Sequence, residues 1–205
     1  SYRDGEGGLA GQLDDYAFMV NGLLDLYEES FDLAWLQLAL ALTEKQIDLF
    51  GDDVQGGFFE TSGADQSVLV RLKADYDGAE PTGNSVSALN LLRLAWITGN
   101  EAWRQRAGAT IKAFGERLNS YPPILPQMLV AHELSESKPR QFVVAGKLGR
   151  SDTEIMLAML RKRFLPGKIV LLADGESMQF LGEYQPFLAE LPGQENKSSV
   201  YQCDN

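Results

Sequence analysis

The chain has 205 residues, of which 44% are hydrophobic and 23% charged, and its formal net charge at pH 7 is −11. These values are typical of a folded globular protein and exclude general disorder. So strong a negative charge is poorly suited to nucleic acid or an anionic membrane, so we expect neither as a partner. The single cysteine, Cys203, and the single histidine, His132, exclude an internal disulfide and a metal site built from several such residues. We expect no metal and no cofactor.

The ends of the chain carry no targeting signal. No apolar run reaches the roughly 18 residues of a membrane span, and no basic segment followed by an apolar one marks a secretory signal. We therefore expect a cytoplasmic protein. The chain begins at Ser1 in a Gly-rich polar stretch and stops two residues after Cys203, which predicts a fragment of a longer protein.

An internal repeat occupies the first part of the chain. The segment LLDLYEESFDLAWLQLA (23–39) aligns with LLRLAWITGNEAWRQRA (91–107) at a constant offset of 68 residues, which places Trp35 opposite Trp103. Each copy contains an apolar segment, a capping residue and a second helical segment. The repeated unit is therefore predicted to be a helical hairpin.

The two arms of each hairpin have different apolar patterns. The first arms, 16–27 and 86–97, are apolar on most sides, which is typical of an inner helix covered by its neighbours. The second arms begin after Asp32 and Asn100, which stand where N-caps are needed. The second arm of the later hairpin has one apolar face, formed by Trp103, Ala107, Ile111 (or Thr110), Phe114 and Leu118.

A third apolar stretch, 124–134, follows two prolines and predicts another inner helix. Inner and outer layers of hairpins predict a mainly α fold that forms part of an α/α toroid. An open helical solenoid is the alternative, because two units do not determine whether the ring closes. We assign residues 1–135 to this helical part.

The connection between the hairpins, about 51–83, is unusually long. It contains the alternating segments GGFFET (56–61) and SVLVRLK (67–73), which predict a small β-hairpin. Successive inner helices run parallel, so their N-termini share one end of the array. We expect the hairpin to lie over that rim, where binding sites of repeat proteins are common.

The last part of the chain, 136–205, predicts a small α/β unit with a loop-rich tail from 186. Apolar, β-branched runs at 140–146 and 168–174 flank a helical segment at 153–163, which is typical of a βαβ unit with two parallel strands. The loop GKLGRSD (146–152) leads from strand to helix. A plain turn is the simpler expectation; an anion site is the alternative, although the loop matches no phosphate-binding pattern.

Carboxylates and aromatic rings gather at the predicted rim. Carboxylates among aromatic rings suit acid–base chemistry on sugars, which needs one protonated and one ionised acid. The candidate catalytic residues are Asp77, Glu80 and Asp15, and the candidate substrate-binding residues are Asp14, Tyr16, Phe59, Tyr76 and Asn84.

A structural alternative accounts for the same residues. Asp14 or Asp15 can cap the first inner helix, and Asn84 can cap the second, as can its neighbours Thr82 and Ser85. Asp77 and Gly78 can form a turn, and the Phe residues can belong to the core.

Several segments resemble the C-terminal part of the spermatogenesis-associated protein 20 family, whose bacterial relatives are usually called thioredoxin domain-containing proteins. The resemblance covers nearly the whole chain and is carried by LDDYAF, GLLDLYE, GGFFET, RLKADYDGAEPTGNSVSALNLLRL, KIVLLADG and VYQCDN. It implies a thioredoxin-like domain followed by a six-hairpin glycosidase-like α/α toroid. This chain would then lack the thioredoxin-like domain and the first half of the toroid.

The resemblance implies two functions in competition. Toroids of this type include sugar epimerases and glycoside hydrolases, so we expect a domain that binds or processes a carbohydrate or another small molecule. Such epimerases depend on histidines, whereas His132 is expected to be packed or exposed. The alternative is a non-catalytic scaffold that serves the thioredoxin-like domain. The rest of a longer chain, or another subunit, would then cover the open edge of the half-toroid.

A third, weaker idea is a redox role for Cys203. The family's tail carries a Cys-x-Asn-x-x-Cys pattern, and Cys203 and Asn205 match its beginning. The second cysteine of the pattern is not in this chain, which leaves the redox role without its partner thiol.

Overall fold

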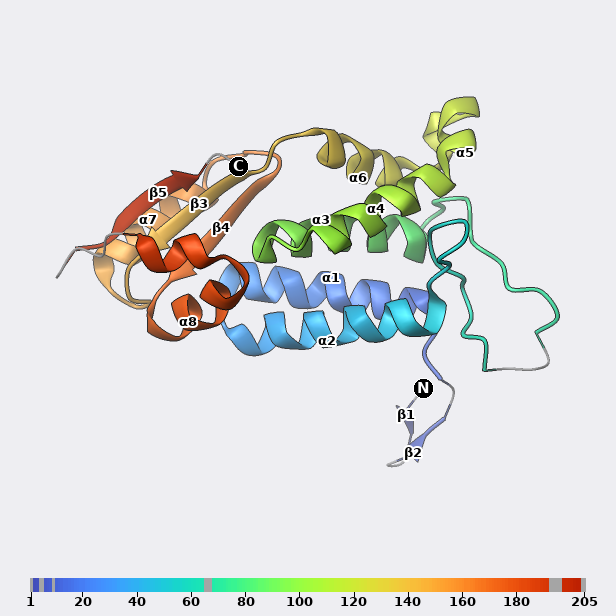
Figure 1. Cartoon of the computed structure of the whole chain (residues 1–205), viewed down its shortest axis with the longest axis horizontal. Helices are drawn as coiled ribbons and strands as arrows, with labels where there is room; N and C mark the ends of the chain where they lie inside the picture. Colours follow the sequence, from blue (N-terminus) through green and yellow to red (C-terminus); the bar gives the residue numbers. More distant parts are fainter. Residues whose placement is uncertain (1, 4–5, 9, 65–67, 192–196, 204–205) are drawn as a thin grey trace.

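A computed structural model describes residues 2–3, 6–8, 10–64, 68–191 and 197–203. Long helices from the first two thirds of the chain pack side by side, and a small sheet with its own helices lies at one end of them (Figure 1). A short antiparallel ribbon, β1 (Tyr2–Arg3) and β2 (Glu6–Gly7), precedes the helices. The helical elements are α1 (Leu13–Ser30), α2 (Leu33–Phe50), α3 (Gly83–Thr98), α4 (Glu101–Ala113), α5 (Gly115–Ser120), η1 (Pro122–Ile124) and α6 (Pro126–Glu136).

The repeat appears as two helical hairpins, α1–α2 and α3–α4. The carboxylate of Asp32 accepts a hydrogen bond from the Ala34 amide at 2.9 Å, and the Asn100 side chain accepts one from Ala102 at 3.0 Å. Both predicted N-caps are therefore confirmed. The inner helices also end alike, because Phe31 and Gly99, which are 68 residues apart, both adopt the left-handed conformation with φ of 56° and 70°.

Helix α3 is the central inner helix. It packs between α1 and α6, and all its residues except Leu89 and Arg93 are buried. The Asn90 side-chain amide donates to the Ala17 carbonyl of α1 at 2.8 Å. The prediction of an inner helix covered on most sides is confirmed for α3, and the third apolar stretch is confirmed as α6.

Helix α1 departs from the same prediction. One of its faces exposes Phe18, Met19 and Leu26, and Met19 is 56% exposed. The prediction of a mostly covered helix is wrong for α1, because the described residues place no helix against this face. The second arm of the later hairpin is buried where predicted, although it is split into α4 and α5 at Phe114.

The connection between the hairpins is not a β-hairpin. The residues described within 51–82 form no strand and only one isolated bridge, between Gly51 and Phe58. Gly56 and Gly57 have φ of 80° and 74°, which turns the chain back where a strand would extend it. The Glu60 amide donates to the Leu72 carbonyl at 2.8 Å, which joins the two predicted segments once. The Glu60 carbonyl instead accepts from the Leu13 amide of α1 at 3.1 Å, and the Phe59 amide donates to the Phe50 carbonyl of α2 at 2.8 Å.

The predicted βαβ unit is confirmed. Strand β3 (Arg140–Ala145) pairs in parallel with β4 (Lys168–Ala173), and α7 (Ser151–Arg161) connects them. The tail contains more regular structure than predicted. After α8 (Gly175–Tyr184) and η2 (Pro186–Glu190), β5 (Ser199–Cys203) pairs antiparallel with β3, which gives the order β4-β3-β5.

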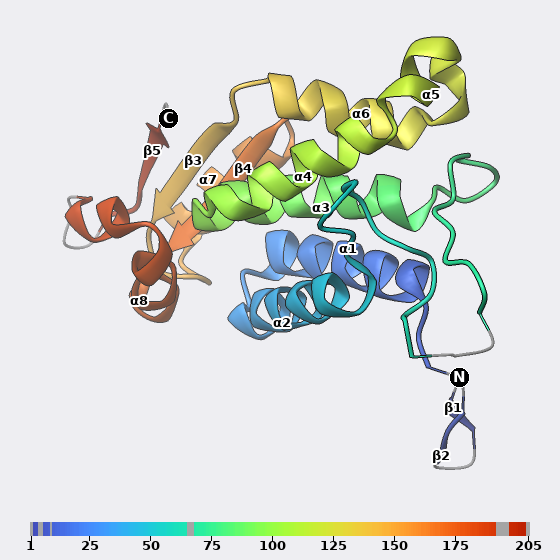
Figure 2. The ribbon, with the colours of Figure 1, turned by 45° about the vertical axis from the view of Figure 1, so that its right-hand side comes forward.

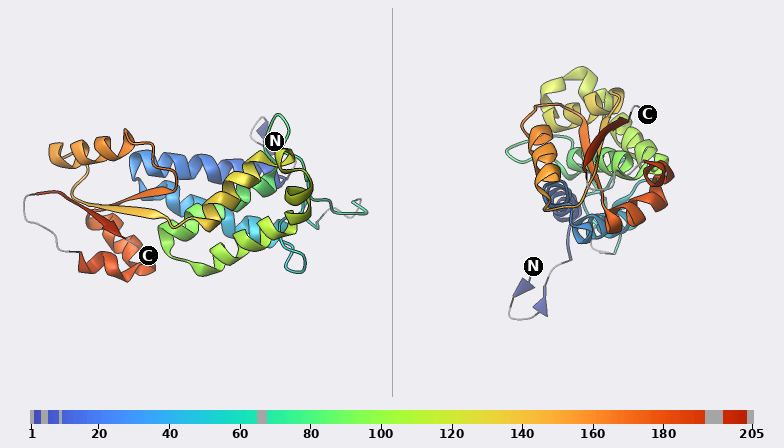
Figure 3. Two further views of the ribbon diagram at one scale, coloured as in Figure 1. Left: turned by 90° about the horizontal axis from the view of Figure 1, so that it is seen from above. Right: turned by 90° about the vertical axis from the view of Figure 1, so that its left-hand side faces the viewer.

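The sheet is covered on both faces. Helix α7 lies on one face and α8 on the other (Figure 3). Val143 and Leu171 share the main core with the long helices, whereas Val144 and Leu172 form a smaller cluster with Leu157 of α7 and Phe31. Among the described residues, no helix combines the length and the apolar character that crossing a bilayer requires.

Candidate functional site

The N-terminal ends of α1, α3 and α6 face the same end of the molecule, beside the 51–82 connection (Figure 2). Aspartates link these neighbouring helix starts. Asp77 accepts hydrogen bonds from the Thr82 amide (Oδ1, 2.8 Å) and from the Gln127 amide of α6 (Oδ2, 2.9 Å). Asp14 likewise accepts a backbone hydrogen bond from Gly83 of α3. The positive ends of the helix dipoles favour carboxylates at all these positions.

A cleft of about 660 Å³ opens beside the first turns of α1. Three carboxylates line it, Asp14, Asp15 and Glu80. Its floor is apolar and is formed by α1 through Phe18, Met19, Gly22, Leu23 and Leu26. We call this site the acidic cleft. It brings together three of the predicted site residues from two different repeats.

The three carboxylates differ in their environments. Burial raises the pKa of Asp14, and the negative charges of Asp15 and Glu80 raise it further, against the opposing effect of the Gly83 hydrogen bond. Asp15 instead accepts a hydrogen bond from the Gln12 amide at 2.8 Å and so caps α1. The acidic cleft therefore holds one exposed acid with a raised pKa beside two further carboxylates.

Two of the predicted site residues, Asp77 and Asn84, lie outside the acidic cleft, and their side chains hydrogen-bond the backbone. Asp77 is 6% exposed, and backbone amides occupy both of its carboxylate oxygens. Asn84 is fully buried and pairs with the backbone of Phe58, accepting from its amide at 2.7 Å and donating to its carbonyl at 2.8 Å. These positions do not fit the catalytic role predicted for Asp77 or the substrate contact predicted for Asn84.

The predicted aromatic residues do not gather around the carboxylates either. The ring of Tyr16 packs edge-on against Phe50, with the centroids 5.4 Å apart. The ring of Phe59 is covered by Arg71, whose guanidinium carbon lies 4.2 Å from the ring centroid, and by Lys73. Tyr76 is exposed but does not line the cleft.

The apolar floor of the cleft was missed by the sequence analysis. Its residues were assigned to a covered inner helix because α1 and α3 have similar apolar patterns. The polar residues on one side of α3 could have shown that the corresponding side of α1 differs. Met19 and Gly22 stand 68 residues before Ser87 and Asn90, the α3 residues that hydrogen-bond the preceding hairpin.

The other charged groups near the rim are paired. Lys73 donates to Asp52 at 2.7 Å and also to the Gly56 carbonyl, and its hydrogen bond lowers the pKa of Asp52 to about 2. Asp75 accepts a hydrogen bond from Arg117 at 2.6 Å. These pairs hold the irregular connection against the helices, so we assign them a structural role.

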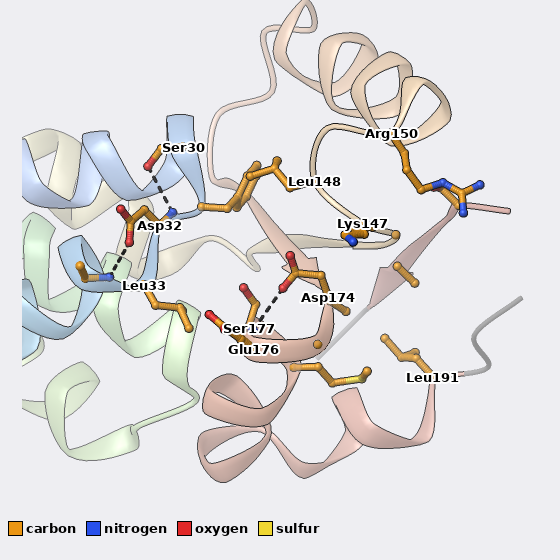
Figure 4. Close-up of a pocket in the computed structure, with 18 of the residues that line it drawn as sticks. Ser30, Asp32, Leu33, Lys147, Leu148, Arg150, Asp174, Glu176, Ser177 and Leu191 are labelled. Atoms are coloured by element: carbon orange, nitrogen blue, oxygen red, sulfur yellow. Dashed lines mark hydrogen bonds between the residues drawn. The ribbon is translucent and has the colours of Figure 1, made fainter. Parts of the chain in front are cut away.

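A second cavity, of about 1190 Å³, lies at the carboxyl ends of β3 and β4 (Figure 4). Parallel sheets often bind ligands at this edge. The cavity is lined by both Lys147 and acidic residues, and Asp174 caps α8 by accepting from the Ser177 amide at 3.2 Å. Arg150 forms an ion pair with Asp152 at 3.1 Å. The 146–152 loop is thus a strand–helix turn in which Arg150 and Asp152 pair with each other, and the mixed charge of the cavity lining indicates no single class of ligand.

The remaining candidates stay apart from the cleft. His132 is exposed on α6, which is one of the two placements expected for it, packed or exposed. Cys203 lies in β5 and forms no disulfide, and Asn205 lies outside the described residues.

No family model matches the chain. Proteins named spermatogenesis-associated protein 20 are similar to it: the human protein is 41% identical over 196 residues, and the mouse protein is 41% identical over 198 residues. An uncharacterised protein of Caenorhabditis elegans is 34% identical over 192 residues. These alignments cover 93–95% of this chain but 25% of each relative. The chain therefore spans about a quarter of the length of the curated relatives it matches.

Proposed function

We propose that the chain is a carbohydrate-binding or carbohydrate-processing part of a longer cytoplasmic protein, with its site at the acidic cleft. The proposal includes further parts of an α/α toroid and a thioredoxin-like domain elsewhere in that protein, with the cleft at the start of α1 left open. The observation that carries it is the meeting of Asp14, Asp15 and Glu80 over an apolar floor, with the pKa of Asp14 raised. A sugar ring offers hydroxyl groups to the carboxylates and an apolar face to the floor.

The proposed chemistry is general acid–base catalysis. In this proposal Asp14 donates a proton to a departing sugar oxygen, and Asp15 or Glu80 accepts one from a water molecule or from the sugar. The exposed Tyr76 is a further sugar contact at the rim. Asp77 acts in this proposal as a positioning residue, because it orients the starts of α3 and α6.

Replacement of Asp14 by asparagine is expected to weaken sugar binding, or to lower any activity found, by at least about tenfold, because asparagine cannot donate a carboxylic proton. Calorimetry with glucose, mannose, N-acetylglucosamine and their oligomers measures the binding. Asp53→Asn is the matched control, since Asp53 is an exposed carboxylate outside the acidic cleft. No sugar binding by the unchanged chain or by the intact protein would contradict the proposal.

The same substitution tests the raised pKa of Asp14. A protonated Asp14 stabilises the folded chain; this contribution is complete below the ordinary value of 3.8 and is lost as the pH rises through the raised pKa. Asp14→Asn is therefore expected to be more stable than the unchanged chain at neutral pH and to differ little at pH 3. Urea unfolding from pH 3 to neutral pH measures the stability difference between the two chains. An NMR titration of the three carboxyl groups measures the direction of the Asp14 pKa shift.

A non-catalytic scaffold is the second candidate, and the exposed face of α1 favours it. The α3 residues that correspond to this face bond to the preceding hairpin: Asn90 donates to Ala17 of α1, and Ser87 accepts from Gln46 of α2. By the same arrangement, Met19 and Gly22 would meet a helical hairpin placed before α1. We propose that such a hairpin of the longer polypeptide, or another subunit, covers this face.

Thiol labelling distinguishes a covered face from an open one. In the intact protein with Cys203→Ser, Met19→Cys is expected to react at least about tenfold more slowly than Val54→Cys, because a packed helix excludes the reagent. Val54 is the control, since it is 94% exposed in the connection between the hairpins. Similar rates at both positions would show that the face is open to water, which counts against the scaffold candidate.

A further inference from the structure

Positive charge is concentrated in one short segment of this acidic chain. Residues 147–168 contain six of the 18 Lys and Arg residues of the chain but only two of its 29 Asp and Glu residues, Asp152 and Glu154. From 155 to 173 there is no Asp or Glu at all. The segment includes α7, which lies on the outer side of the sheet (Figure 3). Within this segment, positive charges therefore outnumber negative ones, which is the reverse of the balance in the chain as a whole.

The same helix exposes large apolar side chains. Its inner face is buried through Thr153 and Leu157, which accounts for its packing on the sheet. On the outer side, Ile155 and Met159, one helical turn apart, are 61% and 58% exposed, and Phe164 beyond the helix end is 93% exposed. Nothing in the packing of the sheet requires these three apolar residues, and exposed apolar clusters of this kind mark interaction surfaces.

The cations near the end of α7 fall into two groups. Lys168 donates to the carbonyls of Leu160 and Arg163, and Arg161 pairs with Glu29 of α1, so these two stabilise the helix end. Lys162 and Arg163 are exposed beside Phe164, and no carboxylate in the described part of the chain pairs with either. They therefore form a positive border along the apolar residues.

We propose that this surface, formed by Ile155, Met159, Lys162, Arg163 and Phe164, docks an acidic segment of a partner protein that also carries apolar side chains. Apolar contacts to Ile155, Met159 and Phe164 supply the burial, and carboxylates of the partner pair with Lys162 and Arg163. The interaction is separate from the acidic cleft and does not depend on carbohydrate binding.

Charge argues for a short protein segment over a membrane or nucleic acid. An extended polyanion spans the molecule and meets its net charge of −11. A short acidic segment experiences mainly the charges within roughly one Debye length, about 8 Å at physiological salt. The carboxylates of Asp25, Glu28 and Glu29 also lie beside α7, but they pair with Arg93 and Arg161, which leaves Lys162 and Arg163 as the cations offered to the segment. The exposed apolar residues further require a partner that brings apolar side chains of its own.

The test uses the 205-residue chain and a fluorescent 16-residue helical peptide with Leu and Phe on one face and Glu on the flanks. Anisotropy titrations are made at 50 mM and 500 mM salt. Lys162→Glu/Arg163→Glu is expected to weaken binding at low salt by at least about tenfold, and high salt to weaken binding to the unchanged chain by about fivefold or more. Ile155→Gln/Met159→Gln is expected to weaken binding similarly at both salt concentrations.

The control is Lys45→Glu/Lys112→Glu, which makes the same charge change at exposed lysines of α2 and α4 and should leave binding unchanged. Equal weakening by the control, or no binding by the unchanged chain at millimolar peptide, would overturn the proposal. So would tighter binding to vesicles containing phosphatidylserine than to the peptide, since that outcome assigns the surface to a membrane. All the substituted side chains are exposed, so loss of binding does not come from unfolding.

Discussion

Asp77→Ala is expected to lower the free energy of unfolding by about 3–4 kcal/mol, because it leaves one buried and one partly buried backbone amide without their charged acceptor. These amides, of Thr82 and Gln127, begin two parallel inner helices, and their bonds to Asp77 measure 2.8 and 2.9 Å. The Asp77 amide itself donates to the Ile124 carbonyl at 2.9 Å. Both the backbone and the side chain of Asp77 therefore bind the long connection to the start of α6.

Urea unfolding followed by circular dichroism measures the effect. Asp75→Ala is the matched control, because Asp75 is a half-exposed carboxylate two residues away whose partner is Arg117, and its loss should cost less than about 1 kcal/mol. Asp77→Asn should fall between the two, since an amide retains one acceptor oxygen. If Asp77→Ala loses sugar binding but stays within 1 kcal/mol of the unchanged chain in stability, the structural role is wrong and the catalytic role is favoured.

Asn84→Ala is expected to cost about 2–4 kcal/mol, since both the amide and the carbonyl of Phe58 would lose their partner in a fully buried site. The Asn84 side chain acts as a short substitute for a neighbouring strand and fixes the turn that begins at Gly56. Phe58 is itself fully buried, so water cannot replace the lost bonds without opening the core.

Thermal and urea unfolding of Asn84→Ala and of Asn119→Ala test this role. Asn119 is exposed on α5, so its replacement should change stability by less than about 0.5 kcal/mol. Equal stability of the two variants would contradict the structural role of Asn84. A loss confined to Asn84→Ala, with the acidic cleft still titrating as before, would separate the support of the rim from its chemistry.

Local signals in the sequence predicted those features that depend on local chemistry. Asp32 and Asn100 were identified as N-caps because a short polar side chain can satisfy the free amides of a helix start without tertiary contacts. The parallel strand pair followed from two β-branched runs separated by one helix. The alternation in 56–73 misled because the chain turns at Gly56 and Gly57 and the backbone beyond them bonds to the helices, through Phe59 to Phe50 and through Glu60 to Leu13.

The candidate site was predicted in part. The shared end of the parallel inner helices was a consequence of the repeat, and it placed Asp14, Asp15 and Glu80 near one another. Which carboxylates would face the same cleft depended on side-chain bonds made across the fold. Both carboxylate oxygens of Asp77 are bound by backbone amides, one of them 50 residues distant in sequence. The pKa of Asp14 is raised by desolvation and, further, by the two like charges beside it.

The helical hairpins, their caps and the parallel strand pair could be predicted from the amino-acid sequence, because capping and apolar periodicity act between residues close in the chain and the 68-residue repeat is visible in the sequence. Which apolar faces are covered, and which carboxylates meet, depended on how the helices pack. α1 and α3 carry similar apolar patterns, yet α3 is enclosed by α1 and α6 while α1 leaves Met19 exposed. Burial and charge proximity are properties of neighbours in space, so the acidic cleft and the outer face of α7 emerged only from the folded arrangement.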